Sequence, residues 1–278
     1  MPSRKPAWLK APLAGRGFSR VKDTVRHYGL HTVCDEARCP NKGVCWGAGT
    51  ATFLILGDVC TRGCRFCAVK SGSEGVGVDA DEPKNLADAA RKLGLRYVVI
   101  TSVDRDDLPD GGAGHYAACI GRVKETGAKV EALIPDYQGQ MLKTVVDAGP
   151  DVLAHNIEVV ERLQSLRDAK ATYRGSLETL RQAKELGTTT KSSIMLGLGE
   201  TGGEVLQAMD DLRGVGCDIL VLGQYLQPTI RQVPVKEYVT PEKFREYGGA
   251  AKSRGFRTVV SEPLARTSYK AGESLTKI

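Results

Sequence analysis

The 278-residue sequence contains no long uninterrupted hydrophobic run. Nothing in it approaches the roughly 20 apolar residues that a membrane-spanning helix needs, so no membrane partner is expected. Its basic start, MPSRKPAWLK, lacks the apolar stretch of a secretory signal peptide. We therefore expect a cytoplasmic protein, in a compartment where thiols stay reduced.

A strong charge of one sign is also missing. The net charge is +6, and the basic residues are spread along the chain rather than gathered in one tract. Such a spread is typical of a solvated surface, and it also suits an acidic partner. No nucleic-acid motif accompanies the charge, so binding to DNA or RNA is not expected.

From residue 51 onwards, stretches that suit strands alternate with helical patterns. The predicted strands are residues 51–57, 96–102, 128–135, 151–158, 189–197 and 217–226. The predicted helices are residues 82–94, 113–127, 138–149, 174–187 and 201–216, and each of them ends in a glycine. This alternation predicts parallel strands covered by helices. Six such strands fit an α/β fold of the partial (β/α)6 TIM-like barrel kind, and an open doubly wound sheet is the alternative.

The sequence divides into three predicted parts. Residues 1–48 form an N-terminal extension, irregular except for a short helix at 21–30. Residues 49–263 form the barrel, and their last stretch, 241–263, holds a further helix and an extended segment that pack on or near it. Residues 264–278 form a C-terminal tail.

The eight cysteines are unevenly distributed. Six of them lie between Cys34 and Cys67. In a reduced compartment, such a cluster indicates metal or iron–sulfur ligation. Cys119 and Cys217 fall in predicted core elements and are expected to pack as small apolar groups.

One triad, Cys60, Cys64 and Cys67, forms the pattern C-x3-C-x2-C directly after the first predicted strand. A structural zinc site needs a fourth cysteine or histidine, and the next candidate is the distant His115. A [4Fe–4S] cluster held by three thiolates instead leaves one iron open, and a small molecule can bind there. The sequence favours the cluster over zinc.

The other triad, Cys34, Cys39 and Cys45, forms the pattern C-x4-C-x5-C. Two simpler interpretations exist for it. One is a zinc knuckle with His31 as the fourth ligand, and the other is a set of buried thiols.

The motif C-x3-C-x2-C with Phe66 before its last cysteine resembles the signature of radical S-adenosylmethionine (SAM) enzymes. The resemblance implies that the amino and carboxylate groups of SAM chelate the open iron. It also implies that one electron cleaves the sulfonium, giving a 5′-deoxyadenosyl radical that abstracts a hydrogen atom.

The order of the two triads, with GDVCTRGCRFC second, resembles the lipoyl synthase family. The likeness continues through RKPAWLK, VKDTVR, TSVDRDDLPDGGA, HNIE, KSSIMLGLGET, GQYLQPT and RTSYKAG, which is nearly the whole chain. That family usually has Ser-Ser where this chain has Thr267-Ser268. There, the oxygen of the second serine is the fourth ligand of an auxiliary [4Fe–4S] cluster.

Carried over, the resemblance implies that Ser268 completes a cluster on the first triad of the sequence. A hard oxygen ligand among soft thiolates is easily lost, which suits a cluster that is dismantled to supply sulfur. Without the resemblance, Ser268 reads as an exposed serine near the end of the chain.

The resemblance further implies the reaction and its partners. Two sulfur atoms are inserted at C6 and C8 of an octanoyl-lysine on a carrier domain, either a 2-oxoacid dehydrogenase E2 or a glycine cleavage H protein. Electrons come from a ferredoxin or flavodoxin, and SAM is consumed. A radical route is required because an unactivated methylene offers no acidic proton for base catalysis. Biotin synthase, which lacks the N-terminal triad, and a non-catalytic electron-transfer or zinc-binding protein are the alternatives.

Residues at the carboxyl ends of barrel strands are the candidates to bind SAM. Hydroxyl groups suit its carboxylate, a carboxylate suits its ribose, a lysine balances an anion and glycines allow close approach. The candidates at strand ends are Thr101, Ser102, Asn156, Glu158, Gly197 and Gly199, and Gln224 and Tyr225 are expected at the same mouth. Lys191 is a further candidate, because a lysine could balance an anion. The aspartate-rich stretch TSVDRDDLPD is expected to be a solvated loop there rather than a divalent-metal site, and His115 to be structural.

Overall fold

The computed structural model describes residues 5–10, 15, 17–269 and 271. The chain forms two compact units. The N-terminal unit comprises Ala11–Gly63 and Ala68–Leu153. The C-terminal unit comprises Met1–Lys10, Cys64–Cys67 and Ala154–Ile278. Among the described residues, no helix is both long and apolar enough to cross a membrane.

The N-terminal unit is built on a sheet whose strands follow one another in chain order. The order is β1 (His31–Thr32), β2 (Thr52–Ile55), β5 (Tyr97–Ser102), β6 (Lys129–Leu133) and β7 (Val152–Ala154). Strands β2, β5 and β6 are parallel, whereas β1 runs antiparallel to β2. The sequence did not predict β1, because two residues are too short for a periodic pattern.

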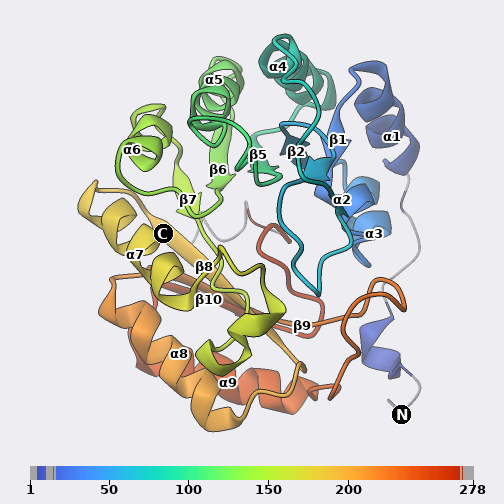
Figure 1. Cartoon of the computed structure of the whole chain (residues 1–278). Coiled ribbons are helices and arrows are strands. Elements are labelled where there is room, and N and C mark those ends of the chain that lie inside the picture. The colour runs from blue at the N-terminus through green and yellow to red at the C-terminus, as the bar shows by residue number, and fades with distance from the viewer. Residues whose placement is uncertain (1–4, 11–14, 16, 270, 272–278) are drawn as a thin grey trace. The chain divides into compact units, whose positions relative to one another are not determined.

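Helices α4 (Glu82–Leu93), α5 (Ala113–Lys124) and α6 (Gly139–Asp147) lie side by side in this unit (Figure 1). Each was predicted within a few residues. Helix α4 shows why: Pro83 stands in its first turn, and Gly94 ends it in the left-handed region with a φ of 68°. Helix α1 (Phe18–His27) begins three residues earlier than predicted.

The segments that carry the cysteines are short. Cys34 lies in α2 (Val33–Glu36) and Cys45 in α3 (Lys42–Gly47). The sequence predicted that Cys60 follows directly on the first barrel strand, and this prediction is wrong. Cys60 lies in a separate short strand, β3 (Val59–Cys60), which pairs in parallel with β4 (Lys70–Ser71).

In the C-terminal unit, the strands also follow chain order: β8 (Thr190–Leu196), β9 (Ile219–Gln224) and β10 (Thr258–Ser261), all parallel. The 3-10 helix η1 is Ala7–Leu9, and η2 is Glu161–Leu166. The α-helices are α7 (Tyr173–Glu185), α8 (Gly202–Gly214) and α9 (Pro241–Ser253). The segment after α9, predicted only to pack on or near the barrel, contains a strand of the sheet.

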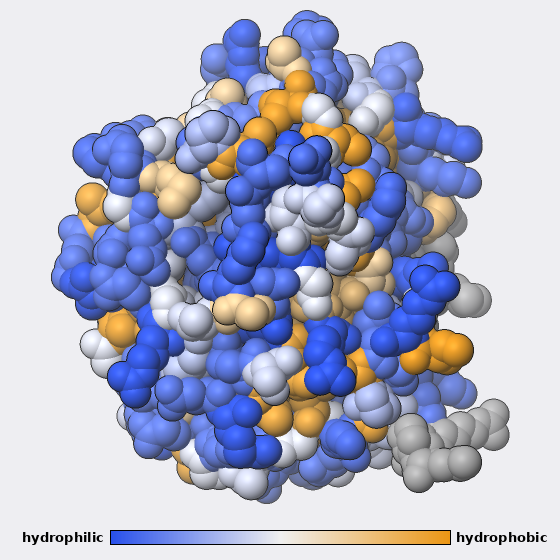
Figure 2. All heavy atoms as spheres, in the orientation of Figure 1, coloured by the Kyte–Doolittle hydropathy of each residue, from blue (hydrophilic) through white to orange (hydrophobic). Residues whose placement is uncertain are grey.

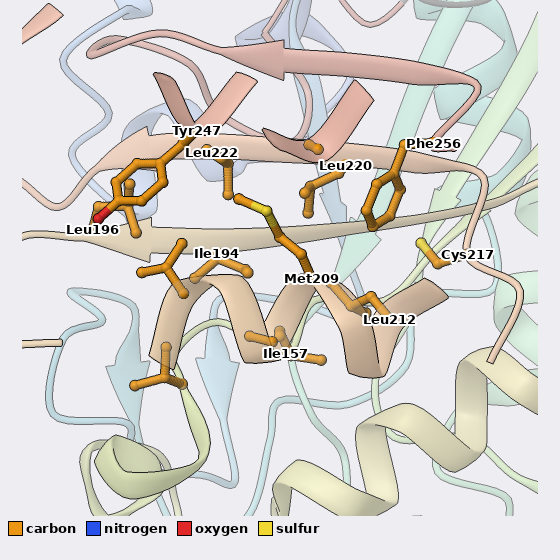
Figure 3. Close-up of a cluster of buried hydrophobic side chains, with 14 of the residues drawn as sticks. Ile157, Ile194, Leu196, Met209, Leu212, Cys217, Leu220, Leu222, Tyr247 and Phe256 are labelled. Atoms are coloured by element: carbon orange, nitrogen blue, oxygen red, sulfur yellow. The ribbon is translucent and has the colours of Figure 1, made fainter. Parts of the chain in front are cut away.

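Helices α8 and α9 pack their apolar faces against β8 and β9 (Figure 3). Met209 and Leu212 of α8 and Tyr247 of α9 meet Leu220 and Leu222 of β9 in one buried cluster. Cys217, in the same cluster, is fully buried, as predicted for a small apolar group.

The strand order distinguishes the two predicted folds. A doubly wound sheet reverses its strand order at a switch point. Within each unit, however, the strands run in chain order, β2-β5-β6-β7 and β8-β9-β10, and the pairs β2-β5, β5-β6, β8-β9 and β9-β10 are parallel. This is the arrangement of a partial TIM-like barrel, which confirms the predicted fold class. The predicted boundaries at residues 48 and 263 stay predictions.

Candidate functional site

The N-terminal cysteine triad is assembled by two short helices. Cys34 is buried, while Cys39 and Cys45 are partly exposed. The N–H of Cys39 donates to the carbonyl of Cys34 at 3.1 Å, which folds this part of the chain tightly. Burial raises the pKa of Cys34 to about 11 and that of Cys45 to about 12, and the other thiols of the triad add to both shifts.

Trp46 follows Cys45 in α3 and is buried. Its side chain is 1% exposed, and Lys42 lies over its ring with Nζ 4.3 Å from the ring centroid. Its Nε1 makes no hydrogen bond of good geometry among the described residues. The indole nevertheless lies close enough to Cys34 to oppose the effect of burial on the pKa of that thiol. A buried N–H next to these cysteines fits an iron–sulfur cluster, because it can donate a hydrogen bond to a sulfur atom.

Backbone N–H groups point at the sulfur of Cys60. The N–H groups of Arg62 and Asp104 both donate to its Sγ at 3.4 Å. Its own S–H donates to Oδ2 of Asp104 at 3.5 Å. Donors to sulfur stabilise a thiolate and tune the iron–sulfur clusters that thiolates hold.

Arg62 gathers three carboxylates beside Cys60. Its guanidinium lies 3.4 Å from Asp104 and 3.2 Å from Asp106, and it also contacts Asp136. Burial raises the pKa of Asp104, and the positive charge of Arg62 opposes that rise. The sequence gave no signal for Arg62 and Asp136, because they lie 74 residues apart and follow no shared pattern.

Cys64 and Cys67 belong to the C-terminal unit. The sulfur of Cys64 accepts a hydrogen bond from the N–H of Asp168 at 3.3 Å. The N–H of Cys67 donates to the carbonyl of Cys64 at 3.0 Å, and the carbonyl of Cys67 accepts from Gln232 at 3.0 Å. A network of backbone and amide groups therefore holds these two thiols within their unit.

Thr101 and Ser102 end β5, as predicted. The hydroxyl of Thr101 donates to the carbonyl of Leu133 at 3.0 Å, so its proton is used within the sheet. Oγ of Ser102 is buried and, among the described residues, makes no hydrogen bond of good geometry. It lies near Tyr137, whose pKa is raised by burial and lowered slightly by this serine. Ser102 is the better donor of the two.

Asn156 and Glu158 follow β7 and are joined to each other. Nδ2 of Asn156 donates to Oε1 of Glu158 at 3.0 Å. Glu158 has a φ of 63°, in the left-handed region that non-glycine residues seldom adopt. Such backbone strain is concentrated at functional sites.

Lys191, Gly197 and Gly199 lie at different places along and after β8. Lys191 is the second residue of β8, so it lies at the opposite end of the strand from the two glycines. Its side chain is fully buried. A Cβ on Gly197 would lie 2.1 Å from Nε2 of Gln224 and 2.3 Å from the carbonyl of Glu237. We expected Gly197 to let a ligand approach the backbone closely. The atoms that lie close to it here belong to Gln224 and Glu237 of the protein.

Gln224 ends β9, as predicted, and its side chain binds backbone groups. It is fully buried, and its Nε2 donates to the carbonyls of Leu196 at 3.1 Å and Glu237 at 2.9 Å. Its Oε1 accepts from the N–H of Val239 at 2.8 Å. Tyr225, which is also buried, donates its hydroxyl to a backbone carbonyl at 2.8 Å.

The aspartate-rich loop is exposed at Asp106, Asp107 and Asp110, as predicted for a solvated loop, and two of these carboxylates are also held by hydrogen bonds. Asp107 pairs with Arg105 at 2.9 Å, and its pKa is lowered to about 2, chiefly by that hydrogen bond. Asp110 accepts from the N–H groups of Gly112 and Gly114, both at 2.9 Å. These carboxylates are used by the protein itself.

Ser268 lies in a turn of the C-terminal tail and is partly buried, not fully exposed. Its neighbour Thr267 donates its hydroxyl to Oδ1 of Asn156 at 3.1 Å. Ala265 packs against β9 so closely that a Cβ on Gly223 would lie 2.1 Å from its carbonyl oxygen. The tail up to Tyr269 is thus docked within the C-terminal unit.

Comparisons with known proteins agree with these features. The radical SAM superfamily matches residues 54–212, and the N-terminal domain of lipoyl synthase matches residues 2–39. Lipoyl synthase of Methanocella arvoryzae is 52% identical over 99% of this chain and 96% of that protein. Lipoyl synthase of Pyrobaculum calidifontis is 54% identical, over 97% and 95%. The crystal structure of methylornithine synthase has a TM-score of 0.58 at 14% identity, over 90% of this chain and 84% of that one, a likeness of fold.

Proposed function

The chain belongs to the lipoyl synthase family of radical SAM enzymes, and we propose that its two cysteine triads hold two [4Fe–4S] clusters with separate tasks. The reaction of this family is the insertion of two sulfur atoms at C6 and C8 of a protein-bound octanoyl-lysine. When bound, one cluster with SAM supplies the hydrogen-abstracting radical, and the auxiliary cluster supplies the sulfur.

The assignment of the radical cluster to Cys60, Cys64 and Cys67 is supported by the N–H groups that point at sulfur. Two of them reach Cys60 and one reaches Cys64. These donors favour the thiolate form that binds iron and tune the cluster. Arg62, held by its carboxylates, fixes the backbone from which one of the donors comes.

The auxiliary cluster is assigned to Cys34, Cys39 and Cys45, with Ser268 as the fourth ligand. The first part is supported by the position of these cysteines on two adjacent short helices and the loop between them, where the N–H of Cys39 donates to the carbonyl of Cys34. The docked, partly buried position of Ser268 supports the second, because an ordered tail can present one oxygen reproducibly. Oxygen is the ligand that this site releases most readily.

For SAM, we favour Ser102, Asn156 and Glu158. Ser102 has a hydroxyl that its surroundings leave without a well-formed hydrogen bond. Glu158 projects from a strained position after β7, and a carboxylate suits the two hydroxyls of a ribose. Thr101, Lys191, Gly197 and Gly199 are retained as weaker candidates, since protein groups already use Thr101 and Gly197.

The substrate is an octanoylated carrier protein. We propose that the carrier is a lipoyl domain of a 2-oxoacid dehydrogenase E2 or a glycine cleavage H protein, and that ferredoxin or flavodoxin provides the electrons. The net charge of +6 suits an acidic carrier.

The test is mass spectrometry of an octanoyl-lysyl peptide after incubation with the reconstituted protein, dithionite and SAM. The expected product is heavier by two sulfur atoms less two hydrogens, with 5′-deoxyadenosine formed alongside. Stoichiometric iron without deoxyadenosine would instead indicate an electron-transfer protein.

A further inference from the structure

Leu56 follows β2, shortly before the chain reaches Cys60, and its backbone is strained. Its φ is 68°, and Gly57 follows with a φ of 91°. Leucine seldom adopts this left-handed region, because its Cβ crowds the backbone. The side chain is 1% exposed. A strained residue persists only where its surroundings hold it in place.

Two buried charged side chains hold the backbone of Leu56. Its N–H donates to Oε2 of Glu82 at 2.9 Å, and its carbonyl accepts from Nη1 of Arg105 at 3.1 Å. Glu82 is only 7% exposed and Arg105 only 3%. Since burying a charge is costly unless it is partnered, these contacts are more than incidental packing.

Each of these two side chains is held in turn by a second group. Nε2 of His115 lies 2.7 Å from the same Oε2 of Glu82. Because a carboxylate only accepts hydrogen bonds, the ring nitrogen donates. Asp107 pairs with Arg105 at 2.9 Å. The side chain of Leu56 also fills the space beside Gly112, where a Cβ would lie 2.4 Å from Cδ1 of the leucine.

We propose that Glu82, Arg105 and His115 form a clamp that fixes Leu56 and so positions Cys60, four residues later, for cluster binding. Between them lie Gly57 and the buried Val59, whose strand pairs with β4. The clamp residues are positioning residues, since they act through the backbone. The inference rests on the proposed role of Cys60 as a cluster ligand.

A metal ion is the other use that this group suggests. The ligand atoms of Glu82, His115 and Cys119 lie within 4.8 Å of one another. The hydrogen bonds to Leu56 and between Glu82 and His115 already give these side chains a task, however, and Cys119 is fully buried. We therefore assign the group to the backbone of Leu56, and the test includes a zinc measurement.

The experiment follows the release of iron from the full-length protein, with both clusters loaded, to a chelator under anaerobic conditions. Glu82→Met keeps the side-chain volume but removes the acceptor, and His115→Phe removes the second group. Glu82→Gln retains an acceptor for Leu56. The inference is supported if four irons leave about tenfold faster or more from Glu82→Met than from the unchanged protein. Losing the groups that orient a metal ligand has an effect of about this size. Release from Glu82→Gln should remain close to that of the unchanged protein.

Asp151→Asn is the matched control. Asp151 also receives a strand N–H, that of Val130 at 2.8 Å, and a cation, Lys124 at 3.2 Å, but it lies just before β7. We expect it to affect thermal unfolding without changing iron release. Equal release rates in Glu82→Met and in Asp151→Asn would overturn the inference. So would stoichiometric zinc that is lost in His115→Phe.

A further variant separates this inference from the proposed function. Cys60→Ala should lose four irons and the change in the electron paramagnetic resonance spectrum that SAM causes. If Cys60→Ala keeps both, the assignment of Cys60 fails. If it loses both while Glu82→Met releases iron normally, only the clamp fails. Should Glu82→Met not fold, His115→Phe provides the same comparison.

Discussion

The hydroxyl of Thr267 donates a hydrogen bond to Oδ1 of Asn156 at 3.1 Å, across 111 residues of sequence. Within the C-terminal unit, this bond ties the residue before Ser268 to the segment after β7. Asn156 in turn donates to Glu158 at 3.0 Å. The residue next to a proposed cluster ligand is therefore joined to two proposed SAM contacts in one hydrogen-bond chain.

Thr267→Val should disrupt this chain while keeping the shape of the side chain. Losing one partner of a buried hydrogen bond costs about 1–3 kcal/mol, so the ratio of docked to undocked tail should fall about fivefold or more. We expect lipoyl formation to fall by up to that factor while 5′-deoxyadenosine still forms. Thr267→Ser, which retains the hydroxyl, should restore the coupling. Unchanged lipoyl yield from Thr267→Val would show that the bond has no role in presenting Ser268.

Changing Cys34, Cys39 and Cys45 together to alanine should remove one cluster. The reconstituted protein is expected to carry about eight irons, four in each cluster, and this variant about four. Cleavage of SAM should continue without sulfur insertion. Iron analysis and a deoxyadenosine assay measure both effects. A folded variant that no longer cleaves SAM would contradict the proposed division between the two triads.

Ser268→Ala should remove the oxygen ligand while leaving the three thiolates in place. Sulfur insertion should fall sharply and deoxyadenosine should still form. Ser268→Cys should hold the cluster more firmly and also impair turnover, because a soft thiolate releases iron less readily than an oxygen does. Mössbauer spectra and product assays on both variants test this. Normal lipoyl formation by Ser268→Ala would mean that Ser268 is not a ligand.

Leu220→Ala should destabilise the C-terminal unit, because Leu220 of β9 is fully buried in one cluster with residues of α8 and α9. A leucine-to-alanine change in a core costs about 2–5 kcal/mol in the free energy of unfolding. Ile230→Ala is the control, since Ile230 is 96% exposed and should change that free energy by less than about 0.5 kcal/mol. Urea unfolding of the cluster-free protein compares the two. Similar costs would contradict the packing in Figure 3.

Binding to the octanoylated carrier should weaken as salt rises. The net charge is +6, and the face seen in Figure 2 is largely hydrophilic. Attraction between exposed charges is screened over about 8 Å at physiological ionic strength. Titrations at several salt concentrations measure the effect. A dissociation constant that does not change with salt would remove the electrostatic argument and leave the substrate assignment intact.

The sequence alone determined the features that depend on local pattern. Helix α4 was predicted with its first-turn proline and its terminal glycine, because propensity, capping and periodicity agree within a few residues. The alternation of strands and helices predicted the fold class. The order of the two triads, together with the motifs along the chain, resembled one family.

Only the tertiary structure decided how distant groups are used. The partners of Leu56 lie 26 and 49 residues away, and no local pattern marks them. Gln224 ends a barrel strand as expected, but the backbone groups that its side chain bonds could not be read from the sequence. Strand β10 exists because it pairs with β9, which its own four residues do not reveal. Periodicity reports which side of an element is apolar, whereas the partner of a buried polar group is set by the packing of the whole chain.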